Sequence, residues 1–228
     1  VPAVMEQAGE KGVKVAVVIS AGFREVGPEG AELERRVGEI ASRHGIRVLG
    51  PNCLGVISTR NHLNATFTDD FPLAGHVAVT SQSGAMGTIL LDWAKGTKIG
   101  FSQFVSVGNK LDIDEADLLT YFRDDPDTRV IGMYVEGMRR GREFIEQASG
   151  TSRCKPIIAL KAGRTSTGAR AASSHTGALS GSDSVYSAAM AEAGVLRVKT
   201  LDEFFDLLQA FASMPLPRGD GVAIVTNA

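Results

Sequence analysis

Apolar, mostly β-branched runs recur along the chain, and segments with apolar residues at helical spacing separate most of them. Continuous apolar runs are typical of strands that are buried on both faces of a parallel sheet. The alternation of such strands with helices predicts an α/β protein. We expect strands at 13–20, 46–50, 76–81, 101–108, 130–137, 156–163, 196–199 and 221–228.

Three of the intervening segments carry clear helix signals. In residues 86–94, apolar side chains recur at spacings of three and four, and Gly96 offers a C-terminal stop. Asp114 is placed to cap a second helix, and Ser182 is placed to cap a third that ends at Gly194.

The pattern is interrupted between residues 58 and 75, where the sequence is polar, aperiodic and holds both Gly and Pro. We interpret this stretch as a domain boundary. The two strands before it are too few for an independent doubly wound sheet. The five strand–helix units from His76 to about Met214 suffice for a complete flavodoxin-like sheet. We therefore divide the chain into the C-terminal part of one domain (1–68), a flavodoxin-like domain (69–215), and a linker with the first strand of a following domain (216–228).

Composition narrows the class of protein. The 228 residues are 43% hydrophobic and 22% charged, which is ordinary for a globular protein with a buried core. The formal net charge of −2 offers no basic face for nucleic acid or an anionic membrane surface. No apolar run reaches the roughly 18 to 20 residues that a membrane helix needs. Two cysteines without disulfide or metal-ligand spacing are typical of reduced thiols in a cytoplasmic protein.

Candidate chemistry lies at the strand ends, because open α/β sheets bind ligands beyond the carboxyl ends of their strands. In "AVTSQSGAMG", Ser83 and Gly84 open a helix whose free N–H groups favour an anion; a plain helix cap is the alternative. Glu136 follows the strand 130–137 and precedes a glycine; here the alternative is an ordinary surface carboxylate. Gly22, Asn52 and Cys53 follow the first two strands, where they would lie beside a nucleotide-like ligand.

The segment "LKAGRTSTGARAASSHTGALSG" places His175 among hydroxyls and glycines on a polar loop. A lone histidine usually has a structural role, but on this loop it shares the sheet edge with Glu136, and imidazole is nucleophilic near neutral pH. The stretch "GRTSTGAR" approaches a P-loop, but Ala169 and Arg170 replace the required Lys and hydroxyl. The chain lacks the G-x-S-x-G elbow that a serine hydrolase of the α/β type would need. The four histidines show no metal-ligand spacing, so we expect no metal site.

The stretches "ISAGF", "RVLGPNCLGV", "VTSQSGAMG", "YVEG" and "SSHTGALSGSD" occur in this order. With them, the whole chain resembles the ADP-forming (NDP-forming) acyl-CoA synthetases, relatives of the succinyl-CoA synthetase α subunit. The resemblance implies a Rossmann-like CoA-binding domain, present as its C-terminal half, before the flavodoxin-like ligase domain. It implies that His175 is phosphorylated and that Glu136 orients it. It also implies that Ser83, Gly84, Ala85 and Gly177 hold phosphate and that Gly22, Asn52 and Cys53 meet CoA.

The reaction that this resemblance implies converts acyl-CoA, phosphate and ADP to the free acid, CoA and ATP through an acyl phosphate and a phosphohistidine. It implies CoA, phosphate, ADP or ATP, and Mg²⁺ with the nucleotide. It also implies an ATP-grasp domain or subunit, which this chain lacks, and an oligomeric assembly. The alternative is a regulatory acyl-CoA-sensing domain of a protein lysine acetyltransferase. The presence of His175 with Glu136 favours catalysis. A third hypothesis is a thioesterase-like hydrolase, which would act without nucleotide or phosphate.

Overall fold

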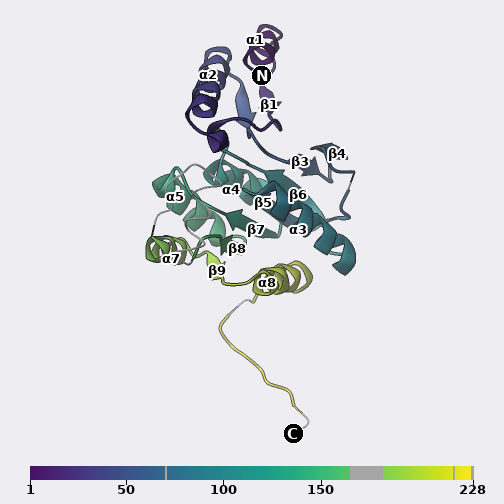
Figure 1. The fold of residues 1–228 in the computed structure, drawn as a ribbon. Coiled ribbons are helices and arrows are strands. Elements are labelled where there is room, and N and C mark those ends of the chain that lie inside the picture. Colours follow the sequence, from purple (N-terminus) through teal and green to yellow (C-terminus); the bar gives the residue numbers. More distant parts are fainter. Residues whose placement is uncertain (70, 165–181, 218, 227–228) are drawn as a thin grey trace.

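Two sheets organise the chain in the computed structural model, which describes residues 1–69, 71–164, 182–217 and 219–226 (Figure 1). In the smaller sheet two short strands pair in parallel, and two helices and a 3-10 turn (Arg24–Val26) accompany them. Met5, Phe23 and Val37 are among the side chains that form its core. These elements are α1 (Pro2–Glu10), β1 (Val15–Val17), α2 (Pro28–His44) and β2 (Arg47–Leu49).

The larger sheet has seven strands in the order β4-β3-β6-β5-β7-β8-β9. From β6 to β9 every neighbouring pair is parallel, and the order β6-β5-β7-β8-β9 is that of a flavodoxin-like sheet. β3 and β4 join one edge as an antiparallel pair. The strands are β3 (Gly55–Ser58), β4 (Leu63–Thr66), β5 (Ala74–Ser81), β6 (Phe101–Ser106), β7 (Val130–Val135), β8 (Ile157–Lys161) and β9 (Leu196–Val198).

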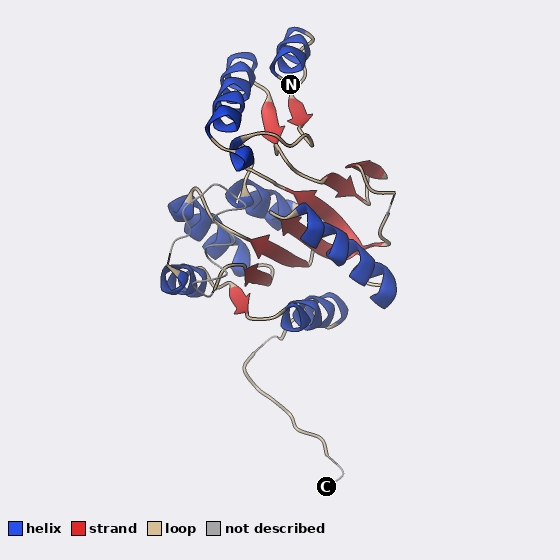
Figure 2. Cartoon of the chain, in the orientation of Figure 1, coloured by secondary structure: helices blue, strands red, loops and turns tan. Residues whose placement is uncertain are grey.

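Helices cover both faces of the larger sheet (Figure 2). Successive strand residues point to opposite faces, so Ala78 packs in the cluster with α4, α5 and α7, whereas Val77 and Val79 pack in the cluster with α3 and α8. This double burial explains the continuous apolar strands and confirms the α/β prediction. None of the described helices could cross a membrane, given its length and hydropathy. The helices are α3 (Gly84–Thr97), α4 (Glu115–Asp124), α5 (Gly141–Ser152), α7 (Asp183–Glu192) and α8 (Leu201–Ser213).

The helix signals have mixed outcomes. Asp114 caps α4 through a capping box, as predicted. Ser182 occupies the N-cap position of α7 but makes no side-chain cap bond. The prediction that Gly96 stops α3 is wrong, because the helix continues to Thr97 and ends where Lys98 turns left-handed at φ 57°. A lysine in that conformation carries no sequence signal comparable to glycine.

The structure adds detail to the segments between the expected domains. The polar stretch 58–75 contains β4, and the change from one sheet to the other falls between Leu49 and Gly55. The described residues 219–226 form no strand and leave Val225 97% exposed, and the strand expected at 221–228 stays a prediction. A strand needs a neighbour to pair its backbone, and no described strand lies beside this segment. The division at residue 68 stays a prediction.

The loop after β6 joins the two sheets. Asn109 N–H donates to Pro51 O at 2.9 Å, and Leu111 N–H donates to Gly50 O at 2.8 Å. Gly108 has φ 52°, and a Cβ there would lie 2.3 Å from the Pro51 carbonyl oxygen. The close backbone approach at Gly108 therefore requires glycine, and it sets the N-terminal elements against the edge of the larger sheet where its parallel strands end.

Candidate functional site

Five parallel strands of the larger sheet end at the same edge. β5 and β7 are neighbours, with Ser81 opposite Tyr134, so the residues that follow them lie side by side. The sequence predicted functional groups in both places: Ser83 and Gly84 after β5, and Glu136 after β7. The structure brings these two groups together, because the strand order places β5 between β6 and β7.

The first group is the N-terminus of α3. Ser83 is its N-cap, and its hydroxyl accepts a hydrogen bond from Met86 N at 3.3 Å. Ser81 fixes the turn, because its hydroxyl donates to Ser83 O at 2.7 Å. Gly84 and Ala85 follow as the first helical residues, whose N–H groups have no carbonyl partner inside the helix. This helix start is built to meet an anion with backbone N–H groups and the positive end of the helix dipole.

The second group is the buried turn around Glu136, which is only 9% exposed. Its backbone N–H and that of Gly137 both donate to Gln82 Oε1, at 2.9 and 3.0 Å. Burial raises the pKa of Tyr134, and the nearby Glu136 carboxylate raises it further. The reading of Glu136 as an ordinary surface carboxylate therefore does not fit its burial.

A buried lysine marks the end of β8 beside this turn. Lys161 is 2% exposed, donates to Ala162 O, and lies over the Tyr186 ring at 4.6 Å from the ring centre. The hydroxyl of Tyr186 accepts a hydrogen bond from Met138 N at 3.1 Å. Burial lowers the pKa of Lys161, and Arg197 adds to the lowering, while Glu136 opposes it. The end of β8 and the start of α7 therefore both lie against the turn that carries Glu136.

His175 and Gly177 lie outside the described residues. The chain leaves β8 at Lys161 and returns at Ser182, ahead of α7. Both places are anchored to the turn after β7 by the contacts of Tyr186. The roles of His175 and Gly177 stay predictions.

The CoA-related candidates lie at the ends of the smaller sheet. Gly22 follows β1 with φ 97°, and its N–H donates to Glu25 Oε1 at 2.6 Å. Asn52 follows β2 with φ 55°, and its side-chain amide donates to Asn109 Oδ1 at 3.3 Å. Both therefore lie beyond the carboxyl ends of adjacent parallel strands, as their sequence positions predicted. Their contact with a ligand stays a prediction.

Cys53 lies at the same place but points inward. Its side chain is 4% exposed, and its thiol donates to Val18 O at 3.5 Å. Burial raises the pKa of the thiol to about 11. Near neutral pH the thiol is therefore protonated and enclosed, so a ligand would meet the backbone at this position rather than the sulfur.

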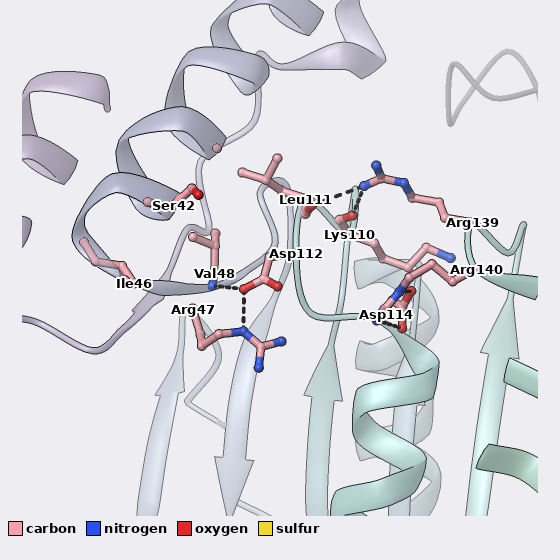
Figure 3. A pocket seen from close by; sticks show the side chains of 13 residues that line it. Ser42, Ile46, Arg47, Val48, Lys110, Leu111, Asp112, Asp114, Arg139 and Arg140 are labelled. Atoms are coloured by element: carbon pink, nitrogen blue, oxygen red, sulfur yellow. Dashed lines mark hydrogen bonds and ion pairs between the residues drawn. The ribbon is translucent and has the colours of Figure 1, made fainter. Parts of the chain in front are cut away.

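A cavity of about 590 Å³ lies between α2, the start of β2 and the loops after β6 and β7 (Figure 3). Arg47 pairs with Asp112 at 2.8 Å, and Arg140 pairs with Asp114 at the start of α4. Arg139 donates to backbone carbonyls of the loop after β6. These contacts fasten that loop to both sheets. Among the described residues, no group of three or more histidine, cysteine or acidic side chains is placed to hold a metal ion.

Both parts of the chain match models of known protein families. Residues 74–211 match the model of the succinyl-CoA ligase like flavodoxin domain. The chain belongs to this family. Residues 1–59 match the model of a CoA binding domain, and both strands of the smaller sheet lie within these residues. The resemblance in the sequence is thereby confirmed.

Several relatives of the ligase-like chain carry functional names. It is 53% identical to the Pyrococcus furiosus acetate–CoA ligase [ADP-forming] I subunit alpha, over 100% of this chain and 49% of that one. It is 51% identical to the Methanocaldococcus jannaschii acetate–CoA ligase [ADP-forming], over 100% of this chain and 32% of that one.

Among solved structures, it resembles a Ca. Korarchaeum cryptofilum acetyl-coenzyme A synthetase 1 in complex with phosphate and ADP. The TM-score is 0.92 at 47% identity, with 95% of this chain and 47% of that chain covered. The chain therefore spans between about a third and a half of the length of these relatives.

Sequence reasoning missed one part of the ligase-like site. The half-buried Gln82 and the buried Lys110 and Glu115 form a hydrogen-bonded group beneath the turn of Glu136. The available signal was a lysine in the short loop after a buried strand, with a glutamate five positions later at a helix start. Nothing in the pattern indicates that both side chains turn inward.

Proposed function

We propose that this chain is the α-subunit-like portion of an NDP-forming acyl-CoA synthetase, and that His175 carries the phosphoryl group between its two reactions. The observation that carries the proposal is the convergence at one sheet edge. A capped helix N-terminus, the buried Glu136, and both described flanks of the segment holding His175 meet there. The names of the relatives support the same reaction.

The chemistry balances in three steps. Phosphate attacks the thioester of acyl-CoA, which releases CoA and forms an acyl phosphate. An imidazole nitrogen of His175 then attacks phosphorus, and the carboxylate leaves as the free acid. In the last step, a terminal oxygen of ADP attacks the phosphohistidine, which regenerates the imidazole and forms ATP.

The residues of this chain have defined parts in these steps. Glu136 accepts a hydrogen bond from one ring nitrogen of His175, so the other nitrogen stays basic and faces phosphorus. The N–H groups of Gly84 and Ala85 stabilise the phosphoryl oxygens. A helix N-terminus contributes about 0.3 to 2 kcal/mol to such an anion, which positions the group without trapping it.

We assign the remaining ligands as follows. Gly22 and Asn52 contact CoA through the backbone at the ends of β1 and β2, because no Cβ occupies the space at Gly22. ADP or ATP, with its Mg²⁺, binds to an ATP-grasp domain or subunit. We propose that the working enzyme is an oligomer that includes this part, which size-exclusion chromatography with light scattering would test. Both cysteines are unpaired, which favours a reducing, cytoplasmic location, testable by cell fractionation.

The test is direct phosphorylation of the full-length protein together with its ATP-grasp part. Incubation with labelled phosphate and acetyl-CoA should yield an acid-labile phosphoprotein, and His175→Ala should abolish the label while CoA binding persists. His62→Ala removes an exposed histidine from the β3–β4 turn and serves as the matched control. A stable label in His175→Ala would contradict the proposal. Acyl-CoA binding without any label in the unmodified protein would favour the regulatory, acyl-CoA-sensing alternative.

Glu136→Gln keeps the shape of the side chain but removes its charge. We expect the rate of His175 phosphorylation to fall on the order of 100-fold, because the ring loses the partner that orients it. Rapid-quench measurement of the labelled protein checks this rate. An unaltered rate would show that Glu136 has no part in orienting the ring.

A further inference from the structure

A buried cation lies beneath the turn that carries Glu136. Lys110, in the loop after β6, is 2% exposed and adopts a left-handed backbone with φ 58°. Its ammonium donates to Glu115 Oε1 at 2.8 Å, to Gln82 Oε1 at 3.1 Å and to Gly137 O. All three donor positions of the ammonium are thus used.

Gln82 links this cation to the candidate catalytic turn. Its Oε1 accepts the N–H groups of Glu136 and Gly137 as well as the ammonium of Lys110. The peptide between Glu136 and Gly137 is therefore held on its N–H side by Gln82, and the next carbonyl is held by Lys110. Three strand-end loops, which follow β5, β6 and β7, meet at this point.

Stability alone does not account for this arrangement. Glu115 is 3% exposed, so the ion pair with Lys110 is fully buried. Desolvation of two charges offsets most of their attraction, and well-packed apolar side chains in place of such a pair are often neutral or stabilising. A buried, fully bonded polar group instead holds its neighbours in one geometry.

We propose that Lys110, acting through Gln82 and balanced by Glu115, is a positioning residue that fixes the Glu136 carboxylate for its work on the phosphohistidine. This inference rests on the proposed function and adds residues to its site. Lys110 does not touch the reacting atoms. It holds the backbone from which the Glu136 side chain extends, and a catalytic carboxylate misplaced by about 1 Å can cost on the order of 100-fold in rate.

Two sets of variants in the full-length protein separate positioning from folding. Lys110→Met with Glu115→Met removes both buried charges together, so that neither is left uncompensated. Gln82→Met removes the shared acceptor, whereas Gln82→Glu keeps an acceptor oxygen in its place. Lys155→Met is the matched control, because Lys155 also donates to two backbone carbonyls. It lies before β8, at the amino ends of the parallel strands and away from Glu136.

We expect about 10- to 100-fold slower His175 labelling in the double variant and in Gln82→Met. Lys155→Met should label near the unmodified rate, and Gln82→Glu, which keeps the acceptor oxygen, should label faster than Gln82→Met. In a Glu136→Gln background, the double variant should add little further loss, since groups that act through one another are not additive. Thermal unfolding by circular dichroism reports folding for each variant, and Gln82→Met decides the question if the double variant does not fold.

The failures are distinguishable. Folded variants that label at the unmodified rate would overturn the positioning role and leave the proposed function intact. A rate loss that is fully additive with Glu136→Gln would also overturn it, because Lys110 would then act independently of Glu136. No label in the unmodified protein would overturn the proposed function, and this inference with it.

Discussion

The buried thiol of Cys53 gives a quantitative test of how the N-terminal part packs. Burial raises the pKa of this thiol from 9.0 to about 11 in the folded chain. Between these values the unfolded chain loses the proton while the folded chain keeps it. The stability that the thiol contributes is therefore complete below pH 9 and declines as the pH rises toward 11.

The magnitude follows from the two pKa values. Each pKa unit corresponds to about 1.4 kcal/mol, so the whole contribution is about 2.7 kcal/mol. At pH 10, where the unfolded thiol is mostly ionised and the folded thiol is mostly protonated, about 1.4 kcal/mol should be lost.

Urea unfolding of the 228-residue chain at pH 7 and pH 10 measures this loss. Other groups titrate in the same range, so the quantity of interest is the stability difference between the unmodified chain and Cys53→Ala. At pH 7 the unmodified chain should be more stable, and this difference should shrink by about 1.4 kcal/mol at pH 10. Cys154→Ala, which removes the exposed thiol, is the matched control. A difference that stays constant with pH would refute the burial of Cys53 and return its sulfur to the candidates for ligand contact.

Two further predictions concern backbone geometry and capping. Gly108→Ala should destabilise the chain by about 1 to 3 kcal/mol, because its Cβ would meet the Asn52 carbonyl oxygen at 2.3 Å in a left-handed backbone. Gly96→Ala, inside α3 with open space around its Cβ, should instead stabilise by about 0.5 to 1 kcal/mol. Chemical denaturation measures both, and equal effects would contradict the close approach at Gly108. Asp114→Ala should cost about 1 to 2 kcal/mol for the lost capping box and more in total, because Arg140 also loses its ion-pair partner. Ser182→Ala, which removes no cap bond, should cost less. A larger loss for Ser182→Ala would show that the caps are assigned the wrong way round.

The sequence indicated the candidate residues at the strand ends, but it did not indicate the strand β4. Small or polar residues directly after an apolar strand can be recognised in the sequence alone. This pattern indicated Ser83, Gly84 and Glu136. The strand β4 had no such signal. The strand Leu63–Thr66 is the outermost strand of the larger sheet and is mostly polar. It is a strand because its backbone pairs with β3, and its sequence carries no apolar pattern that would indicate this.

The supporting group under Glu136 was beyond the reach of a single sequence. From the sequence alone, Gln82 is one more polar loop residue, and Lys110 would be expected to be a solvent-exposed charge. They form one network only because β6, β5 and β7 are adjacent, which joins Gln82 to Lys110 across 28 positions and to Glu136 across 54.

The sequence by itself determined the alternation of strands and helices, the flavodoxin-like count of five units and the cap of α4. These features depend on contacts between residues close along the chain, or on burial of both faces of a strand, and the residue pattern records both. Only the tertiary structure decided which strands are neighbours, that Cys53 and Lys110 point inward, and that Gly108 brings the two sheets into contact. Burial of a charge or a thiol depends on partners from distant segments, and the pattern of one strand does not encode which segments those are.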